Sequence, residues 1–127
     1  MSAYVADAMT VGIVSCAPDT PLREVAALMA RHNVHAVYVY DEPGTTAEEW
    51  ALVSDLDLVA AWPVLDDRTA GNSAVTPLVS IEAEDSLERA AQLMMETGST
   101  HLAVVARMTG QPVGVLSTLD IARVVAV

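Results

Sequence analysis

The sequence contains no lysine, and its only basic side chains are 6 arginines. Against them stand 17 aspartates and glutamates, which give a formal net charge of -11 at pH 7. A nucleic-acid partner requires a basic face that neutralises phosphates, and an anionic membrane surface attracts polybasic segments. We therefore expect neither nucleic acid nor a membrane among the partners, and we attribute the acidity to solubility rather than to a ligand.

The chain has a single cysteine, Cys16, which excludes an internal disulfide. Its longest apolar runs have the length of a strand and fall well short of the roughly 18 residues of a membrane helix. The start, Met1-Ser2-Ala3-Tyr4, lacks the basic residues and apolar stretch of a signal peptide. We therefore expect a cytoplasmic protein, and the hydrophobic fraction of 53% predicts a well-buried interior.

An internal repeat dominates what the sequence does contain. Val14-Ser15 recurs as Val79-Ser80, and the helix positions that follow recur at the same spacing. Ser54-x-x-Asp57 recurs as Ser117-x-x-Asp120 at a slightly shorter spacing, so the first half has the longer loop. We divide the chain into a first repeat at 4–64, a linker at 65–69 and a second repeat at 70–127.

Each repeat predicts the order strand, helix, strand, loop, strand, helix. The expected fold class is α+β, with two βαββα repeats forming one pseudo-twofold module. A repeat of about 60 residues buries little apolar surface alone, so we expect sheets and helices packed across a shared core, with two equivalent clefts between the halves. Residues 41–49 form a polar, acidic loop in this prediction, and residues 107–111 form a tighter turn.

The first helix of each repeat has recognisable end signals. Thr20-Pro21 predicts an N-cap followed by proline at the first helical position. Asp85 to Glu88 predicts an acidic capping box at the matching place. Asn33 and Gly98 fall at matching C-termini, and both residue types accept the left-handed conformation of a C-cap.

The second helix of each repeat begins at a Ser-x-x-Asp motif. Ser117 is placed to cap the helix with its hydroxyl, and Asp120 can reach back to the Ser117 amide. Ser54 and Asp57 repeat this pattern in the first half. On these residues alone, a helix cap without any ligand is the simpler interpretation, because the pattern is a common helix start.

The chain resembles a pair of CBS domains, the cystathionine β-synthase type of regulatory module, from about residue 4 to residue 127. The motifs that carry this resemblance in the first copy are residues 5–10, 19–22, 29–34 and 53–58, and in the second copy residues 76–80, 85–87 and 114–121. Each motif is weak by itself, but two copies in the right order fill the chain.

The resemblance implies a binding site for an adenosine-type ligand such as AMP, ADP, ATP or S-adenosylmethionine. In the family the aspartate of the Ser/Thr-x-x-Asp motif holds the ribose hydroxyls, the Ser/Thr faces the phosphates, and strand residues surround the adenine. The residue that opens the central strand also points at the phosphates. The implied ligand-binding residues are Asp120, Ser117, Thr118, His101, Val79 and Arg123 in the second repeat, and Asp57, Ser54, His35 and Val14 in the first.

Three departures from the family pattern affect the expected ligand, and one of them is Ala51, where the second copy keeps the family's glycine as Gly114. The residue before each ribose aspartate is often arginine, but here it is Leu56 or Leu119. Asp55 adds a negative charge beside Ser54, whereas Arg123 can supply a cation near Asp120. We therefore rank the second site above the first, and we expect a monophosphate or S-adenosylmethionine rather than ATP.

No catalytic or metal-binding set is predicted. One cysteine and three scattered histidines offer no nucleophile with a base and an orienting group, so we expect no enzyme and no cofactor. His32 and His35 lie three positions apart, but no third ligand is spaced to complete a metal site.

Two functions stay open at this point. One is a stand-alone regulatory module that binds an adenosine-type ligand and signals to an unknown partner protein. The alternative is a ligand-independent module for dimerisation and protein interaction. Both include a homodimer, because paired CBS modules usually assemble in twos and a small protein tends to bury broad apolar helix faces.

Overall fold

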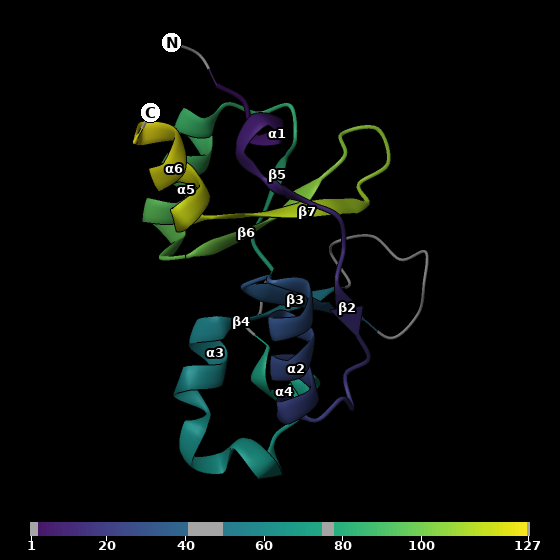
Figure 1. Ribbon diagram of the computed structural model, residues 1–127. Coiled ribbons are helices and arrows are strands. Elements are labelled where there is room, and N and C mark those ends of the chain that lie inside the picture. The colour runs from purple at the N-terminus through teal and green to yellow at the C-terminus, as the bar shows by residue number, and fades with distance from the viewer. Residues whose placement is uncertain (1–2, 41–49, 75–77, 127) are drawn as a thin grey trace. The chain divides into compact units, whose positions relative to one another are not determined.

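The computed structural model describes residues 3–40, 50–74 and 78–126 (Figure 1). The chain forms two compact units, which are Met1–Ile13 with Val79–Val127, and Val14–Leu78. Each unit has its own sheet and its own apolar cluster. The predicted loop at 41–49 lies outside the described residues, as do residues 75–77.

The unit that contains the C-terminal repeat has a four-stranded sheet in the order β1-β7-β6-β5. The strands are β1 (Thr10–Val11), β5 (Ser80–Glu82), β6 (His101–Val105) and β7 (Pro112–Ser117). β5 runs parallel to β6, whereas β6 with β7 and β7 with β1 are antiparallel. The helices are α1 (Val5–Ala8), α5 (Leu87–Thr97) and α6 (Thr118–Val125). All three helices pack against this sheet, because Val5, Leu87 and Leu116 are buried in one cluster joined by Ile121 of α6 (Figure 1).

The other unit has a three-stranded sheet in the order β2-β3-β4. Its strands are β2 (Ser15–Cys16), β3 (Ala36–Val39) and β4 (Ala51–Ser54). Its helices are α2 (Leu22–His32), α3 (Asp55–Ala60) and α4 (Ala70–Ser73), with a 3-10 helix η2 (Trp62–Asp67) that overlaps the predicted linker at 65–69. Leu22, Val37, Val53 and Ala70 belong to its buried cluster. The predicted α+β class is confirmed, and both units carry the βαββα order.

The compact units differ from the sequence repeats at 4–64 and 70–127 in one respect. The segment up to Ile13 belongs to the unit of the second repeat, and α4 belongs to the unit of the first. The Val5 amide donates to the Asp85 carbonyl at 2.8 Å, and the Ala70 amide donates to the Thr20 carbonyl at 2.8 Å. Val5 and Ala70 therefore occupy equivalent positions in the two units, and each is buried in the core of the other repeat.

Two glycines allow this exchanged packing. A Cβ on Gly114 would lie 2.3 Å from the Thr10 carbonyl oxygen, because β1 pairs closely with β7 at this position. A Cβ on Gly71 would lie 2.9 Å from Cβ of Pro18. Only a residue without a side chain fits at the first position without moving backbone.

The helix ends agree in part with the predictions. Asn33 (φ 53°) and Gly98 (φ 69°) are left-handed C-caps, as predicted. The N-cap predictions for the first helix of each repeat were wrong. Pro21 itself is the N-cap residue of α2, and Ser86 caps α5 by accepting a hydrogen bond from the Arg89 amide at 3.0 Å. None of the helices in the described part of the chain has the length and apolar character of a membrane span.

Candidate functional site

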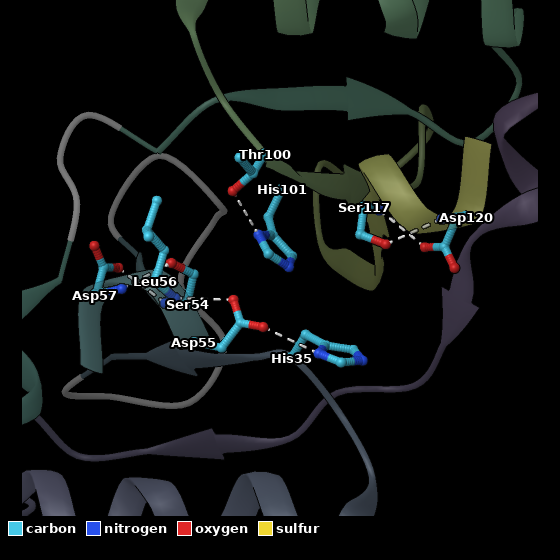
Figure 2. Close-up of polar contacts among 9 residues, drawn as sticks. All are labelled: His35, Ser54, Asp55, Leu56, Asp57, Thr100, His101, Ser117 and Asp120. Carbon is cyan, nitrogen blue, oxygen red and sulfur yellow. Dashed lines mark hydrogen bonds and ion pairs between the residues drawn. The ribbon is translucent and has the colours of Figure 1, made fainter. Parts of the chain in front are cut away.

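The junction between β7 and α6 carries the predicted capping box. The amide of Ser117 donates to Oδ2 of Asp120 at 2.9 Å, and the amide of Asp120 donates to Oγ of Ser117 at 3.2 Å (Figure 2). Asp120 is buried, with 6% of its surface exposed. Its other carboxylate oxygen, Oδ1, lies 3.6 Å from Nη1 of Arg123, whose side chain is 68% exposed. The arrangement presents a fixed, buried carboxylate that is only partly neutralised.

The junction between β4 and α3 repeats this geometry. The Ser54 amide donates to Oδ2 of Asp57 at 2.9 Å, and the Asp57 amide donates to Oγ of Ser54 at 3.3 Å (Figure 2). Asp57 is half-buried and α3 is two residues shorter than α6. The local sequence alone dictates both boxes, because a hydroxyl at the N-cap and an acid three residues later satisfy two orphan amides.

The central strands place His101 and His35 differently. His101 opens β6, and its Cα partner across the ladder is Ser117. In the first repeat Ala36 opens β3 opposite Ser54, so the expectation that His35 opens the strand is wrong by one residue. His35 is the counterpart of Thr100, because their carbonyls accept hydrogen bonds from the first residue of α3 and of α6. In both repeats the central strand begins three residues after the helix C-cap, at Ala36 after Asn33 and at His101 after Gly98. This spacing in the sequence already implied that Ala36, and not His35, is the counterpart of His101.

The contacts of these residues differ accordingly. Oγ1 of Thr100 lies 2.9 Å from Nδ1 of the adjacent His101, and the exposed Thr118 donates its amide to the Thr100 carbonyl at 3.0 Å. In the first repeat Nδ1 of His35 lies 3.1 Å from Oδ2 of Asp55 (Figure 2). Asp55 therefore takes part in the first junction through its side chain, and Thr118 is its counterpart in the second.

The predicted adenine contacts occupy equivalent positions. Val14 and Val79 are both half-buried and both precede the first strand of their repeat. The carbonyl of Val14 accepts the Tyr38 amide at 2.9 Å, and that of Val79 accepts the Ala103 amide at 2.9 Å. Their roles toward a ligand stay predictions, as do those of the other candidate residues.

Sequence reasoning did not find a cavity of about 410 Å³ beside β5 and α5. None of the predicted ligand residues belongs to its lining, which consists of Ser80, Ile81, Glu82, Asp85, Arg89, Leu93 and Val105. Arg107 lies next to it, hydrogen-bonded to Glu82 and 3.7 Å from Asp85. The hydrogen bond to Glu82 raises the pKa of Arg107, which keeps this guanidinium charged. No local motif indicates this group of charged residues around the cavity, because its members come from separate elements.

The remaining candidate groups are the thiol of Cys16 and the imidazole of His32. Burial raises the pKa of the Cys16 thiol, against a smaller opposing effect of its hydrogen bond with Thr20, so the thiol stays protonated at neutral pH. Within residues 3–40, 50–74 and 78–126 no three His, Cys, Asp or Glu side chains come together as a metal site. His32 lies at the exposed end of α2.

Comparison with known proteins identifies the architecture. A family model described as "CBS domain" matches twice, at residues 5–63 and 73–127. No curated protein sequence matches the chain.

Three solved structures illustrate the fold. The CBS domain pair of protein MJ0100, in complex with 5′-methylthioadenosine and S-adenosyl-L-methionine, is 17% identical with a TM-score of 0.85, covering 99% of this chain and 98% of that one. Hypoxic Response Protein I with two coordinated zinc ions is 22% identical with a TM-score of 0.70, covering 95% and 98%. The hexameric CBS-CP12 protein from bloom-forming cyanobacteria is 20% identical with a TM-score of 0.80, covering 96% and 69%. At these identities the likeness establishes the fold.

Proposed function

Because the chain belongs to the CBS domain family, with two copies of the domain, we propose that it is a regulatory module that binds an adenosine-type ligand at the Ser117–Asp120 junction. Asp120 accepts the ribose hydroxyls in this proposal, and Ser117 lies on the phosphate side. Val79 contacts the adenine, while His101, Thr118 and Arg123 contribute to the polar end of the ligand.

The buried carboxylate of Asp120 is the observation that carries the proposal. Oδ2 is fixed by the Ser117 amide, which leaves lone pairs of Oδ1 directed away from the cap. A carboxylate accepts hydrogen bonds from two adjacent hydroxyls in a charge-assisted way, so a ribose diol is a suitable partner. The burial of the acid strengthens such bonds, because less water competes for them.

A solved relative supports the ligand class. The CBS domain pair of protein MJ0100 holds two adenosine compounds, 5′-methylthioadenosine and S-adenosyl-L-methionine. Neither compound carries a phosphate, which is compatible with the absence of arginine at Leu56 and Leu119 in this chain. We propose AMP or S-adenosylmethionine rather than ATP as the physiological type of ligand.

The first junction is a second candidate for the same ligand class. Ser54 and Asp57 have the geometry of Ser117 and Asp120, His35 contacts Asp55 of the same junction, and Val14 precedes β2 as Val79 precedes β5. Asp57 is more exposed than Asp120, so its bonds to a diol compete with water more strongly. We therefore rank the second junction first.

Regulation requires an output, and we propose that a separate partner protein in the cytoplasm receives it. Ligand binding would change the partner's affinity by as much as the partner changes the ligand's, because the two effects are linked. The proposed role is regulatory rather than catalytic.

Isothermal titration calorimetry of the purified chain tests this proposal. AMP, ATP, S-adenosylmethionine and 5′-methylthioadenosine are titrated into the wild type, Asp120→Asn and Asp57→Asn. Asparagine keeps an oxygen that can accept the Ser117 amide but removes the charge, so it separates ligand binding from helix capping. We expect Asp120→Asn to weaken binding at least about tenfold and Asp57→Asn to have a smaller effect. Absence of heat from the wild type with all four compounds would overturn the proposal.

An exposed apolar surface favours the alternative, a ligand-independent interaction module. Leu56, Val59 and Trp62 are 58%, 67% and 75% exposed on α3 and the start of η2. Exposed apolar side chains that gather on one element mark interaction sites, and tryptophan is enriched among residues that dominate binding energy. We propose that this surface takes part in a homodimer, which is compatible with either function. A stable dimer whose melting temperature does not respond to any nucleotide would favour the alternative.

A further inference from the structure

The two junctions differ at the first helical position, which is Asp55 in α3 and Thr118 in α6. The backbones at these positions are equivalent. The Asp55 amide donates to the His35 carbonyl at 2.8 Å, and the Thr118 amide donates to the Thr100 carbonyl at 3.0 Å. An acid and a hydroxyl therefore occupy the same place in two otherwise matching sites.

The carboxylate of Asp55 is held at both oxygens. Oδ1 accepts the amide of Leu56 at 2.9 Å, and Oδ2 lies 3.1 Å from Nδ1 of His35 (Figure 2). The side chains of Asp55 and His35 are about half exposed, at 51% and 55%. Oδ1 of Asp55 thus already accepts a hydrogen bond from an amide in the first turn of α3. Such an amide is the type of donor that binds a phosphate oxygen at a helix N-terminus.

The second junction has no such anion at this position. Thr118 is neutral and exposed, and within the described residues no side chain accepts the amide of Leu119, the counterpart of Leu56. A cation does lie close to this junction, because Nη1 of Arg123 is 3.6 Å from Oδ1 of Asp120. The second junction therefore offers the Leu119 amide and the Arg123 guanidinium to a ligand, whereas the first junction offers the Asp55 carboxylate.

We propose that Asp55, held by His35, restricts the first junction to adenosine-type ligands without a phosphate, whereas Thr118 leaves the second junction open to a nucleoside monophosphate. This inference rests on the proposed function, since it concerns the ligand class of the same two junctions. Like charges within a few ångströms repel each other, so a carboxylate held in place by Leu56 and His35 disfavours a phosphate at this junction. The two sites of one chain would then sense two chemically different adenosine compounds.

Adenosine and AMP differ only in the phosphate, so calorimetric titration with both compounds isolates the effect of charge. For the wild type we expect adenosine to bind at both junctions and AMP at one per chain. Asp55→Thr should add a second AMP site. Thr118→Asp should weaken AMP binding at the second junction at least about tenfold, and should change adenosine binding less than about threefold.

Asp55→Asn and Thr118→Asn are the matched controls, because asparagine has the size of aspartate without its charge. Asp55→Asn should admit AMP to the first junction, and Thr118→Asn should weaken AMP binding less than Thr118→Asp does, because it adds no charge. Thermal melting of each variant without ligand shows whether it is folded. If Asp55→Thr does not fold, Thr118→Asp tests the proposal, and if Thr118→Asp does not fold, Asp55→Thr tests it.

The outcomes separate this inference from the proposed function. If the wild type binds neither adenosine nor AMP, the proposed function fails and the inference fails with it. If the wild type binds adenosine, but the AMP to adenosine ratio is the same in the wild type, Asp55→Thr and Thr118→Asp, only the inference is overturned. Two AMP sites of equal affinity in the wild type would also overturn the inference alone.

Discussion

The amides of Ser117 and Asp120 each donate a hydrogen bond to the side chain of the other residue, at 2.9 Å to Oδ2 of Asp120 and 3.2 Å to Oγ of Ser117. The same carboxylate that we propose as the ribose acceptor is therefore also a structural element of α6. Substitutions at the two residues have to be interpreted with stability and binding measured separately.

Removal of the cap should lower stability without removing the acid. Ser117→Ala loses the acceptor for the Asp120 amide, and we expect the free energy of unfolding to fall by about 1 kcal/mol. Chemical denaturation monitored by circular dichroism measures this. Ser80→Ala, an exposed serine on β5, is the control and should stay within about 0.5 kcal/mol of the wild type. Equal stability of Ser117→Ala and the wild type would show that the capping box contributes nothing.

The close approach of β1 to its paired strand β7 predicts a strong effect of a single methyl group. Gly114→Ala would place Cβ 2.3 Å from the Thr10 carbonyl oxygen, so β1 has to move. We expect a loss of about 1–3 kcal/mol in the free energy of unfolding. Gly71→Ala, with its nearest contact at 2.9 Å to Cβ of Pro18, should lose less. A Gly114→Ala variant as stable as the wild type would contradict the close approach of the two strands at Gly114.

The free energy of unfolding should decrease at alkaline pH because of Cys16. Burial raises the pKa of its thiol in the folded state, so the unfolded chain ionises first as pH rises. Its contribution is fully present below the unfolded pKa, about 8.5, and is lost as pH rises from there through the folded pKa. Urea denaturation between pH 7 and pH 10 should therefore show a decline for the wild type that is smaller in Cys16→Ala.

Alkylation gives an independent reading of the same thiol. Iodoacetamide should modify Cys16 more slowly in the folded chain than in urea at the same pH, because thiolate is the reacting form. Equal rates in the two states would contradict the raised pKa.

The exposed apolar residues of α3 and η2 predict a dimer that depends on Trp62. Light scattering of the wild type should give twice the mass of the chain. Trp62→Ala should shift the mass toward the monomer, because truncation of a buried interface tryptophan is among the most costly changes at an interface. Met108→Ala is the control, since Met108 is 94% exposed but lies on the turn at 107–111. A monomeric wild type, or a dimeric Trp62→Ala variant, would contradict this surface as the interface.

Local sequence signals predicted much of the fold. Ser54, Ser117, Asn33 and Gly98 were correctly placed at helix ends, because each acts through its own backbone or through a partner within one helical turn. The internal repeat predicted the order of the elements, because the same local helix and strand signals occur twice in the chain. Pro21 shows the limit of such signals, since a proline suits both the N-cap and the first helical position and the chain uses the former.

The features that the sequence did not reveal depend on contacts between distant segments. The exchange of α1 and α4 between the repeats follows from the burial of Val5 and Ala70, and no local pattern indicates which core an apolar residue enters. The pair of His35 with Asp55 depends on strand register, where an offset of one residue moves a side chain to the other face.

A structure of the chain crystallised with 5′-methylthioadenosine tests the central claim most directly. We predict that both ribose hydroxyls lie within hydrogen-bond distance of the Asp120 carboxylate, at about 2.5–3.0 Å. Ligand bound elsewhere, for example in the cavity between Glu82 and Arg89, with Asp120 contacting only Ser117 and Arg123, would contradict the account.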